Sequence, residues 1–313
     1  MFFDNKGKLE ASYILSWHMD TSEVFLQILN TVFPLVSIVF VGFVYARVRP
    51  TDMTVANRLN MSVFIPALIF SVMAAKEFHI AQYQGLIIAA ACVVLGSGLL
   101  VWPLCRWLGV SAKTLVPPMM FNNSGNLGIP LLVLAFGEKA LPIAVVLFLT
   151  ENLLHFTVGM YLLDPKTKIM NILKMPMIIA TILGLIWSLQ GWTLAPAVGV
   201  SVDMLGQISI PLMLFALGVR MTEVDLSHWK LGVISGFLCP LSGVIMAFIW
   251  QLTVGLSAED FAYLLVFACL PPAVLNYMVA EIYQQEPHKV ASMVLIGNLM
   301  SLAIVPCVLF YAL

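Results

Sequence analysis

Long apolar stretches separated by short polar connections dominate the chain. A helix that spans a bilayer needs about twenty mostly apolar residues. Stretches of that length occur at 24–46, 55–75, 84–108, 115–136, 140–163, 169–189, 197–219, 230–255, 261–283 and 288–312. The pattern predicts an all-α membrane protein with ten transmembrane helices, numbered 1 to 10 below. Residues 1–23 form an N-terminal extension without an apolar run long enough for a signal peptide, and Met1 and Met19 are alternative starts.

The composition supports a lipid environment. Of the 313 residues, 61% are hydrophobic and 10% are charged, whereas about a quarter of the residues in soluble domains are charged. With 15 Lys+Arg against 16 Asp+Glu, the chain is close to neutral and gives no electrostatic basis for binding nucleic acid. The five cysteines lie in apolar stretches without metal-like spacing, so we expect no metal and no cofactor.

The distribution of Lys and Arg predicts the orientation of the chain. With ten helices, the connections 1–2, 3–4, 5–6, 7–8 and 9–10 share one side and hold eleven Lys and Arg. The other side holds four, Lys6, Lys8, Lys76 and Lys139. Positive residues gather on the cytoplasmic side. We therefore expect a bacterial inner-membrane protein with both termini outside, on the periplasmic side.

Two motifs recur five helices apart. Residues 65–70 in helix 2 and 210–215 in helix 7 share I-P-x-x-x-F, and residues 117–122 in helix 4 and 271–276 in helix 9 share P-P-x-x-x-N. Because five is odd, the second copy enters the membrane from the opposite face, as in the inverted repeats of secondary transporters. Chance is the alternative, since proline is frequent in membrane helices. The pattern predicts repeats at 24–163 and 164–313, in which Asn122 corresponds to Asn276.

The most unusual segment of helix 4 lies between residues 122 and 130. Three Asn, one Ser, two Gly and one Pro are poor material for a continuous lipid-facing helix. Pro130 leaves the carbonyl group of Asn126 without its helical partner, and Gly125 and Gly128 lower the cost of unwinding. Irregular backbone at membrane depth is tolerated where it lines a cavity. We therefore predict a broken helix at a cavity.

Helix 9 breaks in the same way around Pro271-Pro272. Broken helices at corresponding positions of two halves are the best sequence indication of a transporter's binding site. Their free N-termini suit a carboxylate, and no Lys or Arg lies in the two segments. The alternative is that the asparagines only join helices. The candidate substrate-binding residues are Asn122, Asn123, Ser124, Gly125, Asn126, Pro130, Pro272, Asn276, Tyr277 and Asn298.

Glu151 and His155 in helix 5 are four residues apart and share one helical face. An ionisable residue at membrane depth is a functional candidate, and a Glu–His pair can carry a coupling proton. The alternative is an interfacial position near the cytoplasmic half of the helix.

These motifs resemble those of the auxin efflux carrier (PIN-like) family. The resemblance is carried by residues 57–60 leading to 64–70, by residues 123–130 and by residues 271–277, and it runs from about residue 24 to the C-terminus. It implies two inverted five-helix repeats, as in sodium/proton antiporters and bile-acid symporters, with helices 4 and 9 broken and crossing. Helices 1, 2, 6 and 7 would form a scaffold, and helices 3–5 and 8–10 a transport domain. The long cytoplasmic loop of many plant members is absent, so the chain resembles a compact bacterial member.

The resulting prediction is a secondary transporter that exports or exchanges a small organic anion, such as a carboxylate or an auxin-like compound, by elevator-type movement. A cation/proton antiporter and a transporter-like membrane sensor remain alternatives. Neither H-E-x-x-H nor paired transmembrane aspartates occur, so we expect no enzyme. The expected partners are the organic anion and the lipid bilayer. Coupling to a proton or to sodium, and a homodimer joined through the scaffold helices, stay open.

Overall fold

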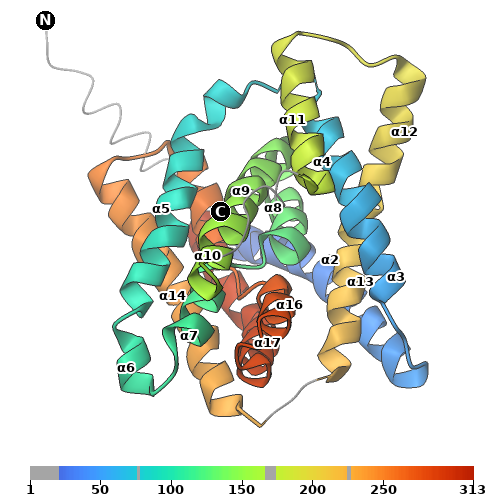
Figure 1. The fold of residues 1–313 in the computed structure, drawn as a ribbon. Helices are drawn as coiled ribbons and strands as arrows, with labels where there is room; N and C mark the ends of the chain where they lie inside the picture. Colours follow the sequence, from blue (N-terminus) through green and yellow to red (C-terminus); the bar gives the residue numbers. More distant parts are fainter. Residues whose placement is uncertain (1–20, 76–77, 166–173, 224–226) are drawn as a thin grey trace, which may run out of the picture.

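The computed structural model describes residues 21–75, 78–165, 174–223 and 227–313. Within these ranges the chain is helical, and its single β contact is an isolated antiparallel bridge between Asn122 and Pro272. The predicted N-terminal extension lies outside the described residues except for 21–23, which begin the first helix (Figure 1).

The first half of the chain contains one long helix and several that are interrupted. Helix α2 (Thr21–Val48) is followed by α3 (Thr54–Leu59), the π-helical turn η1 (Asn60–Phe64) and α4 (Ile65–Met73), which continue one another. The 3-10 turn η2 (Ile80–Tyr83) leads into α5 (Gln84–Val101), and α6 (Leu104–Leu108) follows. Next come α7 (Ala112–Met120), the π-helical turn η3 (Ser124–Gly128) and α8 (Ile129–Phe136). The half ends with η4 (Glu138–Ala140), α9 (Leu141–Leu154), the π-helical turn η5 (His155–Gly159) and α10 (Met160–Leu163).

The second half begins with α11 (Pro176–Leu189), α12 (Pro196–Gln207) and α13 (Ser209–Arg220). The turn η7 (Met221–Glu223) and the long helix α14 (Trp229–Thr253) come next. Helices α15 (Ala258–Ala268) and α16 (Val274–Ile282) are separated by an extended segment, and α17 (Pro287–Ala312) closes the chain.

Seven helical segments in the described part of the chain are long and apolar enough to cross a membrane. They correspond to the predicted helices 1, 2, 3, 5, 7, 8 and 10. The predicted helices 4 and 9 are each divided into two pieces, and the predicted helix 6 is the 14-residue α11. The chain is therefore a multi-pass membrane protein, as predicted, while the count of ten remains a prediction.

The helices pack in two groups. Helix α2 lies along α13, and α4 lies against α11 and α12. On the other side of the molecule α14 packs against α5 and α17, and α5 packs against α7 and α9 (Figure 1). The contact of α2 with α13 is very close, since a Cβ atom on Gly218 would lie 1.9 Å from the carbonyl oxygen of Val39. Small residues allow such approaches between membrane helices.

Side-chain contacts join helix ends that are distant in the sequence. At one end of the molecule, Lys139 Nζ lies 2.7 Å from Glu259 Oε1. At the other, the hydroxyl group of Thr114 donates a hydrogen bond of 2.5 Å to Glu286 Oε2. Both contacts agree with ten helices that cross the membrane in alternating directions. Such an arrangement places the 4–5 and 8–9 connections, which hold Lys139 and Glu259, on one side. It places the 3–4 and 9–10 connections, next to Thr114 and Glu286, on the other side.

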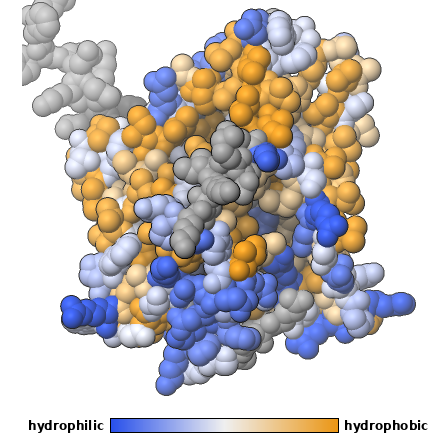
Figure 2. All heavy atoms as spheres, viewed as in Figure 1, coloured by the Kyte–Doolittle hydropathy of each residue, from blue (hydrophilic) through white to orange (hydrophobic). Residues whose placement is uncertain are grey.

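The outer surface is largely apolar. Large hydrophobic side chains such as Phe33, Leu99 and Leu252 are 72%, 73% and 84% exposed. Figure 2 shows apolar side chains over the upper and middle parts of one face, with polar side chains gathered along its lower edge. Apolar surface of this extent is expected where lipid covers the protein.

Candidate functional site

Two interrupted helices cross at the centre of the molecule. Helix α7 ends at Met120 and η3 begins at Ser124, while α15 ends at Ala268 and α16 begins at Val274. The two intervening segments run antiparallel. The backbone N–H of Asn123 donates to the carbonyl oxygen of Pro271 (2.7 Å), and that of Ala273 donates to the carbonyl oxygen of Phe121 (2.9 Å). Both predicted interruptions are therefore present.

The interruption in the first of these helices lies at the start of the predicted segment. It spans residues 121–123, whereas the sequence predicted a break within residues 122–130. Pro130 instead occupies the first turn of α8, directly after η3. Proline is tolerated there, because the first turn of a helix leaves its N–H groups without intrahelical partners. Gly128 is explained by packing, since a Cβ atom on it would lie 2.7 Å from Leu270 Cδ1.

The crossing also corrects the pairing of the two motifs. Its reciprocal hydrogen bonds relate Phe121 to Pro271 and pair Asn122 with Pro272. In this register Asn276 corresponds to Asn126, whereas the sequence motifs paired Asn276 with Asn122, four residues earlier. The sequence pairing failed because Pro117 and Pro118 lie inside α7, whereas Pro271 and Pro272 lie in the interruption itself. The shared prolines therefore mark different places along the two helices.

Two of the predicted asparagines hold the crossing together. The amide group of Asn276 donates to the carbonyl oxygens of Phe121 (2.8 Å) and Ala273 (3.0 Å). The amide group of Asn298, in α17, donates to the carbonyl oxygen of Pro272 (3.0 Å) and accepts from Asn123 Nδ2 (2.7 Å). These bonds satisfy backbone carbonyl groups that an interrupted helix leaves open. Asn276 and Asn298 therefore join helices, as the structural alternative predicted.

A cavity of about 130 Å³ opens beside the crossing. Both groups of helices contribute to its wall. It is lined by Asn57, Asn60, Met61, Ile65, Asn122, Asn123, Gly125, Asn126, Phe148, Glu151, Asn152, His155, Met177, Met213, Ala216, Leu217, Arg220, Ala273, Val274, Leu275 and Met278. Since a single water molecule needs about 10–15 Å³ on the same scale, the cavity has room for a small organic ion.

Two helix N-termini open on this cavity. Gly125 and Asn126 belong to the first turn of η3, and Val274 and Leu275 to the first turn of α16, and all four residues line the wall. The first N–H groups of a helix have no intrahelical acceptor, and they carry the positive end of the helix dipole. The cavity is therefore electropositive on the side of the crossing.

Glu151 and His155 also line this cavity, next to the crossing, and each is only 2% exposed. Ser124 Oγ donates a hydrogen bond of 2.6 Å to Glu151 Oε2. Glu151 Oε1 lies 3.7 Å from His155 Nδ1, and the imidazole ring stacks on Phe121 at a centroid distance of 4.1 Å. Both residues are thus buried beside the crossing.

Four polar atoms on the wall have no hydrogen-bond partner within the described part of the chain. They are Oδ1 of Asn60, Oδ1 of Asn122, Oε1 of Glu151 and Nδ1 of His155. Buried polar atoms in proteins are almost always hydrogen-bonded to protein or to water. Their concentration at one cavity indicates a site that is completed by a polar ligand or by water.

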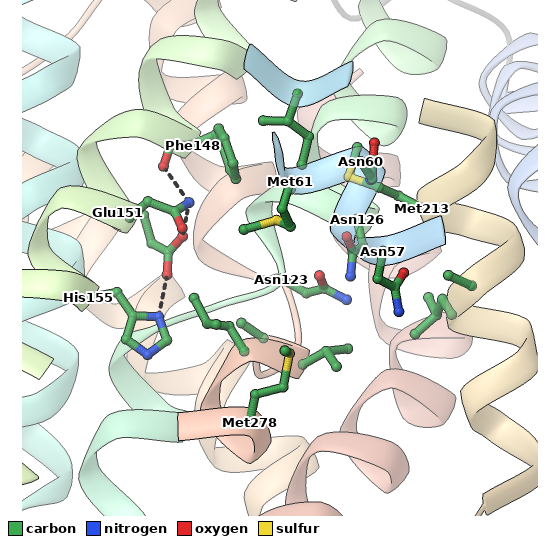
Figure 3. A pocket seen from close by; sticks show the side chains of 18 of the residues that line it. Asn57, Asn60, Met61, Asn123, Asn126, Phe148, Glu151, His155, Met213 and Met278 are labelled. Carbon is green, nitrogen blue, oxygen red and sulfur yellow. Dashed lines mark hydrogen bonds and ion pairs between the residues drawn. The ribbon is translucent and has the colours of Figure 1, made fainter. Parts of the chain in front are cut away.

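Sequence reasoning missed four polar residues of the wall. Asn57 and Asn60 come from the α3–η1 segment, Asn152 comes from α9, and Arg220 comes from the last turn of α13. Asn57 and Asn60 were visible as part of the family motif, whereas Arg220 was counted only as a cytoplasmic charge. Figure 3 shows Asn57, Asn123 and Asn126 on one side of the cavity, and Glu151 with His155 on the other.

The predicted site residues separate into two sets. Asn122, Asn123, Gly125, Asn126, Glu151 and His155 line the cavity. Pro130, Pro272, Asn276, Tyr277 and Asn298 are not part of its wall, and Ser124 contacts it through Glu151. The hydroxyl group of Tyr277 donates to Glu281 Oε1 at 2.6 Å, near the end of α16.

Comparisons with known proteins agree with a membrane transporter. The family described as "Membrane transport protein" matches residues 165–310. A protein of Rhizobium meliloti (strain 1021) named "Putative malonate transporter" is 23% identical over 311 residues, which cover 91% of this chain and 95% of the relative. An uncharacterized transporter of Methanothermobacter thermautotrophicus is 25% identical over 305 residues, covering 90% and 98%. An uncharacterized transporter of Methanocaldococcus jannaschii is 21% identical over 299 residues, covering 88% and 96%.

The matched family and these relatives are transporters, which agrees with the prediction that the chain is not an enzyme. They agree with the resemblance found in the sequence: residues 165–310 match a family of membrane transport proteins, and the chain is similar over most of its length to proteins named as transporters.

Proposed function

We propose that the protein is a secondary transporter of a small organic anion, and that the cavity beside the crossing binds a carboxylate. The observation that carries this proposal is the meeting of two helix N-termini, at Gly125–Asn126 and at Val274–Leu275, on one buried cavity. Each N-terminus is equivalent to about half a positive charge. Backbone N–H groups at such ends are suited to carboxylate oxygens.

Arg220 adds a full positive charge to the same wall. A guanidinium group binds carboxylates through two parallel hydrogen bonds. A dicarboxylate could place one end at the crossing and the other at Arg220, with the asparagines as neutral donors. The "Putative malonate transporter" of Rhizobium meliloti makes malonate the first compound to test.

We further propose ten membrane crossings arranged as two inverted five-helix repeats. The reciprocal hydrogen bonds at Asn123 and Ala273 support this, because a local twofold relation between two crossing segments is what inverted repeats would produce. The contacts Lys139–Glu259 and Thr114–Glu286 agree with the alternation of sides. With the positive-inside rule, both termini lie outside a bacterial inner membrane.

Transport requires that the site open to each side in turn. Besides the cavity at the crossing, a second cavity of about 440 Å³ lies between the same two groups of helices. Its wall includes Ala74 and Ala75 after α4, Asp203 in α12, and Glu138 in η4. These residues lie toward the predicted outer connections, whereas Asn57 and Arg220 lie toward the inner ones. We propose that the group containing the crossing moves against a scaffold of α2–α4 and α11–α13, in an elevator-type exchange.

Transport assays with purified protein in proteoliposomes test this proposal. Uptake and counterflow of malonate and a panel of other carboxylates should be measured with and without imposed proton or sodium gradients. We expect saturable uptake of at least one carboxylate that depends on protein. Uptake of a metal cation with failure of every carboxylate would contradict the proposal.

Cation/proton antiport is the second candidate, and the buried pair Glu151–His155 is the observation that favours it. An antiporter of this kind would exchange protons for sodium in liposomes without any carboxylate. A sensor would bind carboxylate without counterflow. The same assays therefore distinguish all three functions.

A further inference from the structure

His155 separates two cavities. Its ring lines the main cavity on one side, and on the other it lines a small cavity of about 10 Å³ together with Lys113, Thr114 and Asn276. That space is enough for about one water molecule. The ring is buried and stacked on Phe121, and it lies between the two cavities.

The small cavity extends toward the predicted cytoplasmic end of α7. Thr114, on its wall, donates a hydrogen bond to Glu286, and Gln285 Nε2 donates to Thr114 Oγ1 at 2.9 Å. Glu286 also pairs with Lys289. Hydrogen bonds from Lys289 and Thr114 lower the pKa of the Glu286 carboxyl group, so this carboxylate stays ionised at neutral pH. Thr114 thus lies between the ionised Glu286 and the small cavity that His155 also lines.

Glu151 and His155 are arranged to share a proton. Glu151 Oε1 and His155 Nδ1 face one another at 3.7 Å, and neither has a hydrogen-bond partner among the described residues. A hydrogen bond between these atom types has a length of about 2.7–3.2 Å. A proton between Oε1 and Nδ1 would give both atoms a hydrogen-bond partner if the distance between them shortened by less than one ångström.

Few other charged or titratable groups face this pair. Arg220 lines the main cavity together with the pair, and Lys113 lines the small cavity together with His155. From α14 the thiol group of Cys239 is close enough to interact with the charge of Glu151. Of the other helices that pack against α9, α4, α5 and α8 contain no charged residue, whereas α15 carries Glu259, which pairs with Lys139, together with Asp260 and Tyr263.

We propose that Glu151 and His155 form the coupling site of the transporter and that this site takes up one proton when the anion binds. The proton arrives from the cytoplasmic side past Thr114 and does not pass through the anion cavity. The inference rests on the proposed function. An anion and an ionised Glu151 in one buried cavity repel each other, and one added proton neutralises the carboxylate. An O–H bond of a hydronium ion or a water molecule breaks, and the proton forms a new O–H bond at Glu151 Oε1 or a new N–H bond at His155 Nδ1, from which it is hydrogen-bonded to the other atom; no group changes its oxidation state.

Ser124 links the proton to the anion. Its hydroxyl group donates to Glu151 Oε2, and Ser124 is the first residue of η3, whose N-terminus faces the cavity. A change in the charge of Glu151 therefore acts at the helix end that we assign to the carboxylate.

Calorimetry counts the coupled protons. Malonate binding to the purified protein should be measured in buffers of different ionisation enthalpy, because the slope of binding enthalpy against buffer enthalpy equals the number of protons taken up. We expect about one proton for the native protein and for Glu259→Gln, a matched change at an exposed carboxylate. We expect about none for Glu151→Gln. Because one proton is taken up on binding, the affinity of the native protein should fall as the pH rises, by at most about tenfold per pH unit.

Infrared difference spectra test the proton site without any substrate. Acidification protonates many carboxyl groups, so the band of Glu151 is identified by comparing variants. This band should be present in the native protein and in Glu259→Gln and absent from Glu151→Gln. Thr114→Val should slow the appearance of the band while leaving its final size unchanged.

The outcomes separate the two proposals. Malonate binding with no net proton uptake would overturn the coupling and leave the anion transporter standing. Absence of binding by any carboxylate would overturn both the coupling and the proposed function. A band that persists in Glu151→Gln would overturn the proton site itself, and equal rates in Thr114→Val would overturn the proton route.

Discussion

The asparagines of the centre fall into two sets that the sequence alone does not separate. Asn276 uses its amide group to bind the carbonyl oxygens of Phe121 and Ala273. Asn126, its counterpart in the register of the crossing, instead lines the cavity. The same residue type at related positions thus holds backbone in one half and faces the proposed ligand in the other.

This division predicts different consequences for two similar variants. Asn276→Ala should remove the two side-chain hydrogen bonds to the carbonyl oxygens of Phe121 and Ala273, at a cost of about 0.5–1.5 kcal/mol each, and lower the midpoint of thermal unfolding. Asn126→Ala should keep the native unfolding midpoint but weaken malonate binding. Fluorescence-monitored unfolding in detergent and calorimetric titration measure the two effects. A native affinity in Asn126→Ala would assign that side chain to structure alone.

Arg220 is the residue on which anion selectivity should depend most. Arg220 lines the cavity from the last turn of α13, and its Nη2 atom lies 3.9 Å from Met278 Sδ in α16. Loss of a charge-assisted hydrogen bond costs about 1.5–3 kcal/mol. Arg220→Gln should therefore weaken malonate binding by about 10- to 150-fold, and Arg220→Lys should retain part of the affinity because it keeps the charge but not the planar fork.

Titration of each variant with malonate and with acetate checks this prediction. A dianion should lose more affinity than a monoanion when the charge at position 220 is removed. Equal losses for both anions would contradict a direct contact between Arg220 and a second carboxylate group.

At the scale of helices, local chemistry predicted the interruptions, and tertiary structure decided their details. The density of Asn, Ser, Gly and Pro at residues 122–130 predicted a broken helix, and one is present. Its position depends on the hydrogen bonds of Asn123 and Ala273 with the other segment, and no local pattern contains that information. For the same reason the repeated prolines gave a register that is wrong by four residues, about one helical turn.

The polar wall of the cavity shows a similar limit. Asn122, Asn123, Asn126, Glu151 and His155 were predicted because they are polar residues within apolar stretches. Arg220 lies at the end of its helix, where the positive-inside rule already explains an arginine. Nothing in one sequence indicates that the end of α13 lies against η1 and α16 at the cavity.

The close packing of α2 against α13 predicts that a larger side chain at their contact destabilises the protein. A Cβ atom on Gly218 would lie 1.9 Å from the carbonyl oxygen of Val39, and one on Gly42 would lie 2.2 Å from that of Phe215. Backbone atoms cannot yield as a flexible side chain does, so Gly218→Ala should separate the helices and cost at least about 1–3 kcal/mol. Gly199→Ala in α12, whose nearest neighbour is Leu194 Cβ at 3.8 Å, is the matched control.

Thermal unfolding in detergent should show a lower midpoint for Gly218→Ala and an unchanged or slightly higher midpoint for Gly199→Ala, since alanine favours helix over glycine. Equal midpoints in the two variants would mean that α2 and α13 are not held at this distance in the membrane.

For the whole molecule, the two helix groups and the cavities between them can form a transport path only if successive helices cross the membrane in alternating directions, as proposed. The cavity at the crossing and the cavity beside Glu138 lie between the same groups. An anion that enters near Arg220 and leaves near Glu138 would pass from a positively to a negatively charged mouth. Such a gradient of charge favours release on the side of Glu138.

The last prediction concerns the orientation of the chain in the membrane. Arg106, after α5, and Lys139, before α9, are both exposed and lie on opposite sides in the proposed topology. In a background in which the five native cysteines are replaced by alanine, Lys139→Cys should react with a membrane-impermeant maleimide in intact cells, and Arg106→Cys should react only after permeabilisation. Lys139→Cys breaks its exposed pair with Glu259, which contributes about 1 kcal/mol or less, so the variant should still fold. Labelling of both positions from the same side would require an even number of crossings between them, and would therefore contradict counting the interrupted segment α7–α8 as one transmembrane helix.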